Sequence, residues 1–185
     1  MVPEARVTHV DTKTLSAGAG WQVVAAARAI QAGWSLERIL AALKRIGEAT
    51  ESVYTLEELK YLIHGGRISH MKGLIASLLH IKPIIGVEKV NGIYQQQGQA
   101  RTFSRALRTI VELMKRKHTP GSLLRVQVLH SFNPQGAEQL RQQIELVFRC
   151  KWLPVGPMSL VLGAHTGPSM VGVAYADESV FEGMP

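Results

Sequence analysis

The sequence has one cysteine, few aromatic residues and no long apolar run, and each scarcity excludes a class of protein. Because Cys150 is the only cysteine, the chain has no internal disulfide and no cysteine-based metal site, which fits a reducing compartment. Phe, Trp and Tyr make up 6% of the residues, and no basic segment is interleaved with them as a base-stacking surface requires. We therefore expect no sequence-specific binding of nucleic acid.

Long apolar runs and targeting signals are also absent. No run approaches the roughly 20 residues that a membrane helix needs. The start, "MVPEARVTHVDTKTLS", has neither the basic region nor the apolar stretch of a signal peptide. With 185 residues, 46% of them hydrophobic, the chain is long enough to bury a core. We expect a globular, cytoplasmic protein.

The motifs of common enzymes are missing as well. The seven histidines show no HExxH or similar ligand spacing, and no serine lies in a GxSxG turn. "HGGRIS", residues 64–69, is not a phosphate-binding P-loop, because it lacks the glycine spacing and the Lys-Ser or Lys-Thr pair. We expect neither a metal site nor catalytic residues, so an enzyme is the least favoured class.

Positive charge, by contrast, is plentiful. Lys and Arg number 21 against 14 Asp and Glu, and the net charge of +7 favours anionic partners. The helix expected over residues 101–117 carries Arg101, Arg105 and Arg108 on one face and ends in three further cations. Such a face is usually solvated, but it also suits an acidic protein or an anionic membrane surface. A protein-interaction or anionic-surface-binding module is therefore our alternative function.

The spacing of apolar residues predicts an α/β fold, α+β-like, with a mixed or largely antiparallel sheet flanked by helices. "NG" at residues 91–92 predicts a hairpin, and Pro83 should lie on an edge strand or at the start of its strand. The expected strands are a short one followed by a turn in 7–15, then 51–56, one around residue 83, 123–130, and two or more within 152–177. The expected helices cover 21–31, 36–46, 56–66, 70–79, 101–117 and 134–149. Ser16 and Ser35 should cap the first two helices, and Cys150 should lie near the end of the last one.

Residues 1–50 stand apart from the rest of the chain. One short strand and two helices cannot enclose a core, so we expect them to belong to an incomplete first lobe or to the junction between two lobes. Residues 51–185 are expected to form a C-terminal α/β lobe that binds the ligand.

Two short segments have residues that suit a ligand. In "HGGRIS" the glycines leave backbone N–H groups free, and Arg67 offers a planar donor fork for a carboxylate or phosphate. In "GAHTGPS", His165 and Thr166 on a turn at a strand end can donate two convergent hydrogen bonds to one carboxylate. Taken alone, each segment has a simpler explanation: a helix cap followed by a surface arginine, and a turn histidine bonded to backbone.

Four segments occur in the order that is typical of one family. "TLEELKYLIHGGRIS", "ASLLHIKPIIGVEKVNGIY", "ARTFSRAL" and "LGAHTGPSMVGVAY" resemble the second half of the DegV family of bacterial fatty-acid-binding proteins. "VDTKTLSAGAGWQVVAAARAIQAGWSLERI" resembles the segment that joins the family's two lobes. The resemblance implies a DegV-like second lobe preceded by a helical remnant of the first. It also implies a carrier that presents a long-chain fatty acid to a fatty acid kinase, without catalytic residues or a cofactor of its own.

On the matching motifs, the resemblance implies that His165 and Thr166 hydrogen-bond the fatty-acid carboxylate, while Arg67 and Arg101 lie near the head group or the partner surface. It implies an acyl tunnel to which an apolar set contributes, although core packing explains that set equally well. The set is Leu74, Leu78, Leu79, Ile81 and Ile84. The sequence departs from the family at Ser169, where a third glycine is usual, and it lacks the family's N-terminal lobe. We therefore expect weak fatty-acid binding, or a homo-oligomer that covers exposed apolar surface.

Overall fold

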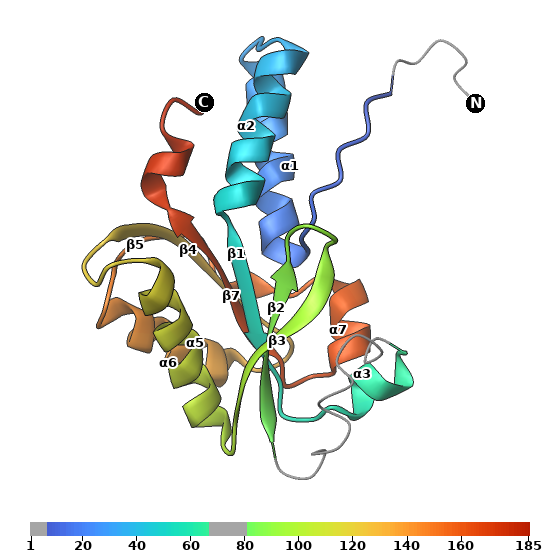
Figure 1. Ribbon diagram of the computed structural model, residues 1–185, viewed down its shortest axis with the longest axis vertical. Helices are drawn as coiled ribbons and strands as arrows, with labels where there is room; N and C mark the ends of the chain where they lie inside the picture. Colours follow the sequence, from blue (N-terminus) through green and yellow to red (C-terminus); the bar gives the residue numbers. More distant parts are fainter. Residues whose placement is uncertain (1–6, 67–80) are drawn as a thin grey trace.

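The computed structural model of the chain describes residues 7–66 and 81–185, and a mixed seven-stranded sheet runs through its centre (Figure 1). The strand order is β3-β2-β1-β7-β4-β5, and β6 also pairs with β4. All neighbours are antiparallel except β4–β5 and β4–β6, which are parallel. The strands are β1 (Glu51–Thr55), β2 (Lys82–Glu88), β3 (Ile93–Ala100), β4 (Leu123–His130), β5 (Arg149–Trp152), β6 (Gly156–Pro157) and β7 (Val171–Asp177). The predicted fold class is confirmed.

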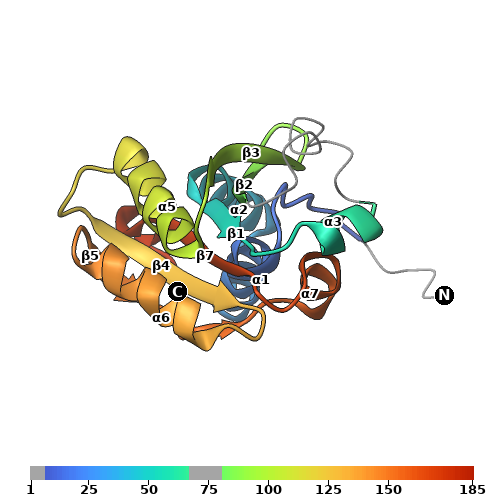
Figure 2. The same ribbon diagram turned by 90° about the horizontal axis from the view of Figure 1, so that it is seen from below.

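Helices lie on both sides of this sheet. The helices are α1 (Ser16–Gln31), α2 (Leu36–Ala49), α3 (Lys60–His64), α5 (Phe103–Lys117), α6 (Pro134–Glu145), α7 (Leu160–Thr166) and the 3₁₀ helix η2 (Glu178–Phe181). Seen from below, α5 and α6 lie on one side of the molecule and α3 and α7 on the other (Figure 2). The α1–α2 hairpin rises above the sheet (Figure 1). Within residues 7–66 and 81–185, no helix is long and apolar enough to cross a membrane.

The face under α5 and α6 is a closed apolar core. Leu107 and Ile110 of α5 and Leu140 of α6 have no exposed surface. They pack on the large side chains that alternate along the strands. On β7 these are Val171, Val173 and Tyr175.

The opposite face is built from smaller side chains. Between the large residues of β7 stand Gly172, Ala174 and Ala176, which point away from α5 and α6. Ala174 and Ala176 belong to a second apolar cluster, which contains Trp21 of α1 and also residues of α2, α3 and α7. Small residues on this face let the helices approach the sheet closely. The helices of residues 16–49 therefore share a core with the sheet, while their assignment to a separate lobe stays a prediction.

Several local predictions are confirmed. The hydroxyl of Ser35 accepts from the N–H of Arg38 at 3.4 Å and caps α2. Asn91 and Gly92 lie in the hairpin between β2 and β3, with Gly92 at a φ of 68°. Gly65 caps α3 and Gly66 follows with a φ of 67°, which is the left-handed geometry that two glycines after a helix predict.

Other predictions are wrong at the N-terminal side. Residues 7–15 form no strand, because they are mostly exposed and no strand of the described chain pairs with them. Ser16 does not cap α1: it is the first helical residue, Leu15 occupies the cap position, and no side chain there makes a capping bond. The prediction for Pro83, by contrast, is met by its second alternative: β2 is no edge strand, since it pairs with both β1 and β3, but Pro83 lies at its start. It is the second residue of β2, outside the stretch that pairs with β1, so its missing N–H costs that ladder nothing.

Two more corrections concern the C-terminal third. The helix expected over 134–149 ends at Glu145, and Cys150 lies in β5, because parallel pairing with β4 takes over from Arg149 onward. The segment around His165 is the helix α7 rather than a strand and a turn. Leu162 and Thr166, four residues apart, are buried, while Leu160 and Val161 are exposed, which is the pattern of a helix. The helix predicted over 70–79 lies outside the described residues.

Candidate functional site

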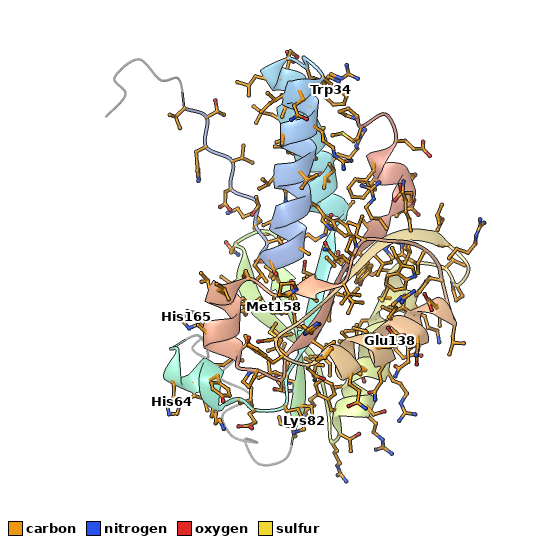
Figure 3. The ribbon with its side chains drawn as sticks, turned by 180° about the vertical axis from the view of Figure 1, so that it is seen from behind. Trp34, His64, Lys82, Glu138, Met158 and His165 are labelled. Atoms are coloured by element: carbon orange, nitrogen blue, oxygen red, sulfur yellow. The ribbon has the colours of Figure 1, made fainter. Side chains whose placement is uncertain are left out.

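The two motifs singled out in the sequence meet at one corner of the fold, where α3 packs against α7 (Figure 3). His165 stands on the last turn of α7, next to Gly65, which caps α3. A Cβ at Gly65 would lie 2.5 Å from Nδ1 of His165, so only glycine leaves room for the imidazole. The corner thus joins "HGG" and "HTGP", which are 100 residues apart in the chain.

Gly167 is the second glycine that this corner needs. It ends α7 at a φ of 77°, and a Cβ there would lie 2.2 Å from Cδ2 of Tyr61 on α3. Both its backbone angle and its contact therefore exclude a side chain. The two glycines fix how closely α3 and α7 approach each other.

Polar contacts hold the turn that follows α7. The N–H of Glu57 donates to the hydroxyl of Ser169 at 3.0 Å, and Nδ2 of Asn133 donates to the carbonyl of Ser169 at 3.2 Å. Ser169 therefore connects this turn to the loop before α3 and to the N-cap of α6. Ser169, at which the sequence departs from the family pattern, thus stabilises the corner through these two hydrogen bonds.

The two predicted carboxylate ligands have different surroundings. The His165 side chain is half-buried at the corner, whereas Thr166 is 2% exposed and its hydroxyl donates to the carbonyl of Leu162 at 2.9 Å. As a second donor to a carboxylate, Thr166 has to release that carbonyl first. The corner therefore offers one accessible polar side chain and one that is engaged by its own helix.

Of the other predicted site residues, the structure describes only Ile81, Ile84 and Arg101. Arg67, Leu74, Leu78 and Leu79 lie outside the described residues. Ile81 is half-buried against the cluster that also contains Leu162. Ile84 is fully buried in the core under α5 and α6, on the other face of the sheet, and its neighbour Ile85 points to the face of α7. Arg101 is exposed just before α5.

A groove of about 930 Å³ lies on the α1 face of the sheet. Its walls are α1, β4, the segment after β5, and η2 with the C-terminal residues. Pro157 and Ser159, directly before α7, are among the lining residues, whereas His165 on the last turn of α7 is not. Its apolar lining includes Trp21, Val24, Ala25, Leu129, Leu153 and Phe181. Sequence analysis missed this groove because four distant segments form it.

Hydrogen bonds fix the floor of the groove. Nε1 of Trp21 donates to Oε1 of Gln127 at 2.8 Å, and Nε2 of Gln127 donates to the carbonyl of Pro154 at 3.1 Å. One amide thus connects α1, β4 and the segment after β5. Because both ends of the amide are engaged, Gln127 can stand in an apolar groove without an unsatisfied polar group.

An ion-pair network forms one wall. Arg125 donates two hydrogen bonds, at 2.8 and 2.9 Å, to the carboxylate of Glu178, and Nζ of Lys151 adds a third at 2.8 Å. These bonds hold the pKa of Glu178 below its usual value, with the Arg125 guanidinium as the main cause. The guanidinium also stacks on Phe181, 3.7 Å from the ring centre. Arg28, at the last turn of α1, is a further cation at the groove.

No group of three or more His, Cys, Asp or Glu among residues 7–66 and 81–185 is placed to hold a metal ion. The thiol of Cys150 is half-buried, and burial raises its pKa to about 11, so it stays protonated at neutral pH. The arrangement therefore suits binding of an apolar molecule with a polar end, through the groove and the corner.

The chain is similar to known proteins of one family. The model of the DegV family, described as uncharacterised proteins, matches residues 1–178. A DegV domain-containing protein of Deinococcus radiodurans is 35% identical over 171 residues, which are 92% of this chain and 60% of that protein. One of Clostridium perfringens is 33% identical over 168 residues, 91% of this chain and 59% of that protein. The chain thus spans about three fifths of the length of these relatives.

A solved structure from Thermus thermophilus has the same fold. It is described as showing fatty acid binding of a DegV family protein, and it is 27% identical to this chain with a TM-score of 0.84. The similarity covers 94% of this chain and 62% of that one.

Proposed function

Because the chain belongs to the DegV family, we propose that it binds a long-chain fatty acid and carries it without catalysing a reaction itself. The observation that carries the proposal is that an apolar groove and the His165 corner lie on the same face of the sheet, with α7 beginning next to the groove and ending at the corner. The fatty-acid-binding relative from Thermus thermophilus supports the same ligand class.

The proposed site of the carboxylate is the corner between α3 and α7. His165, packed on Gly65, is the first donor, and Thr166 becomes the second when its hydroxyl leaves the Leu162 carbonyl. Arg67 and Arg101 are proposed to lie near the head group or on the surface that meets the partner.

The proposed site of the acyl chain is the groove beside α1. Each buried CH₂ contributes about 0.8 kcal/mol, so the apolar lining supplies most of the affinity and the corner mainly sets the direction of the chain. Ile84 has no part in this site, since it faces the other side of the sheet. The groove is open along one side, so we expect modest affinity for the chain alone, and a second copy could cover an exposed acyl chain.

The proposed partner is a kinase that phosphorylates the presented carboxylate. This role fits a head group held at a corner near the surface, where a partner can reach it, and a tail held in the apolar groove. It requires no nucleophile or base in this chain.

The test is fatty-acid binding to the purified chain, with extracted lipids identified by mass spectrometry. We expect His165→Ala to weaken binding of palmitate or oleate about tenfold, the cost of one charge-assisted hydrogen bond. His64→Ala is the matched control, because His64 is exposed on the neighbouring helix α3 (Figure 3).

A second pair of variants tests the groove. Val24 lines the groove, while its neighbour Val23 is exposed outside it. Val24→Glu should abolish binding because it places a charge beside the acyl chain, whereas Val23→Glu should leave binding intact. Equal behaviour within both pairs would refute the proposed site.

A further inference from the structure

A second concave site lies at the other side of the molecule from the groove, on α5. Its volume is about 600 Å³, and Arg101, Arg105 and Arg108 all line it. Gln99 and Ala100 at the end of β3, Ile81, and Thr109 and Glu112 of α5 complete the lining. We call this site the arginine pocket.

The three arginines are not neutralised by the rest of the described chain. No ion pair or side-chain hydrogen bond of Arg101, Arg105 or Arg108 occurs within residues 7–66 and 81–185, and all three are exposed. The carboxylate nearest to them in sequence, Glu112, pairs with Nζ of Lys115 at 3.0 Å. Other cations in the chain, such as Arg125 and Arg141, do have carboxylate partners.

This placement is unfavourable for the free helix. Arg105 and Arg108 are three residues apart on one face, and like charges at that spacing destabilise a helix. Arg105 also lies in the first turn of α5, where the helix dipole favours anions, and that turn contains no acidic residue. A helix with a cationic first turn gains from an anion that binds there.

We propose that the arginine pocket binds a phosphate group carrying two negative charges, as in a phosphomonoester or inorganic phosphate. Guanidinium groups donate in planar forks, and three forks around one concavity match the three terminal oxygens of a tetrahedral phosphate. All three arginines line this one concavity. The proposal does not depend on fatty-acid binding, because the pocket shares no lining residue with the groove.

The test is an NMR titration of the labelled chain with inorganic phosphate at low ionic strength. We expect amide signals near Arg105 and Arg108 to shift, and Arg105→Gln and Arg108→Gln each to weaken binding about tenfold. Arg116→Gln is the matched control, because Arg116 is an exposed arginine of α5 that does not line the pocket. An equal loss in Arg116→Gln would show a diffuse field of charge and would overturn the proposal.

Vesicles distinguish a phospholipid from a soluble phosphate as the source. Phosphatidic acid presents a phosphomonoester, and phosphatidylglycerol presents a phosphodiester with one charge. Sedimentation with phosphatidic acid vesicles alone, lost in Arg105→Gln and kept in Arg116→Gln, supports the pocket with a lipid as source. Binding of inorganic phosphate with the same variant pattern supports it with a soluble source. Binding to neither probe, or only to polyglutamate, overturns it.

Thermal unfolding gives an independent readout. Without phosphate, Arg105→Gln should raise the melting temperature slightly, since it removes repulsion from the first turn of α5. With phosphate, the wild-type chain should gain stability that the variant does not gain. Parallel gains in both proteins would contradict the pocket, whether or not the fatty-acid proposal holds.

Discussion

The two faces of the central sheet differ in the size of their side chains, and three neighbouring pairs of residues in β7 show the difference. Val171, Val173 and Tyr175 point into the closed core under α5 and α6. Gly172, Ala174 and Ala176 lie on the other face, where Tyr54 packs over Gly172 so closely that a Cβ there would lie 2.0 Å from its ring. On one face the strands themselves supply large side chains that fill the core. On the other face the strand side chains are small, which leaves room for helices and a groove.

This difference separates stability from binding. The large side chains of the α5–α6 face are buried in one apolar cluster, whereas the groove lies on the α1 face. On the α1 face, packing depends on glycines, on Gln127 and on the Arg125–Glu178 pair, all of which need specific geometry. We infer that substitutions in the first face cost mainly folding energy, and that substitutions in the second also affect the ligand.

The largest expected loss comes from truncation in the closed core. Leu107→Ala should lower the free energy of unfolding by about 3 kcal/mol, because it loses buried area and leaves an enclosed cavity. Leu129→Ala is the comparison on the other face, since Leu129 is buried and lines the open groove. Urea unfolding should show about half the loss for Leu129→Ala, because the groove adds no enclosed void. Equal losses would mean that both faces are closed.

The next effect is expected at the corner of the α1 face. Gly167→Ala should cost about 2 kcal/mol, because alanine is strained at a φ of 77° and its Cβ meets Tyr61. The displaced α7 should also weaken fatty-acid binding. Gly121→Ala is the control for backbone strain alone, with a φ of 86° and open space around its Cβ. If the two variants lost binding equally, the packing of α3 on α7 would not matter for the site.

Much of the sheet could be predicted from the sequence, because alternation and turn chemistry are local signals. "LLRVQVLH" alternates and forms β4, and "NG" forms its hairpin. The α7 segment could not be assigned in this way, since a short apolar run fits a strand or a buried helix equally well. The role of His165 as a ligand stays a prediction, but the secondary structure predicted for its segment was wrong.

The geometry of the site could not be predicted from spacing. His165 meets Gly65 through the packing of two helices, and no local pattern specifies a contact across 100 residues. Ile84 was predicted to line the acyl tunnel, but its neighbour Ile85 is the residue that faces the α7 side of the sheet. In a strand, a step of one residue exchanges the two faces, and the sequence alone does not fix that register. The groove needs four segments at once, so only the folded chain reveals it.

The ion pair beside the groove should show a pH-dependent contribution. Glu178→Gln should lower the free energy of unfolding by about 1.5 kcal/mol at neutral pH, because it weakens the charged hydrogen bonds of Arg125 and Lys151. The folded pKa of Glu178 is lowered, so its contribution is complete above the ordinary value of 4.5 and is lost as the pH falls through the folded pKa. The difference between wild type and variant should therefore stay constant from pH 7 to about 5 and shrink below 4.5. A difference that persists at low pH would point to packing on Phe181 instead.

The smallest expected change in the free energy of unfolding comes from Trp21, whose substitution best distinguishes an effect on the groove from an effect on the core. Trp21→Phe keeps an aromatic ring against Phe181 but removes the donor to Gln127, and we expect a loss of about 1 kcal/mol in unfolding free energy. Without that bond Oε1 of Gln127 loses its donor beside the groove while Nε2 still bonds Pro154, so fatty-acid affinity should fall by more than the stability loss alone explains. Trp152→Phe is the matched control, because Trp152 packs against the α5–α6 core. It should alter stability without altering fatty-acid binding, and a binding loss there would show that the two faces of the sheet are not separate.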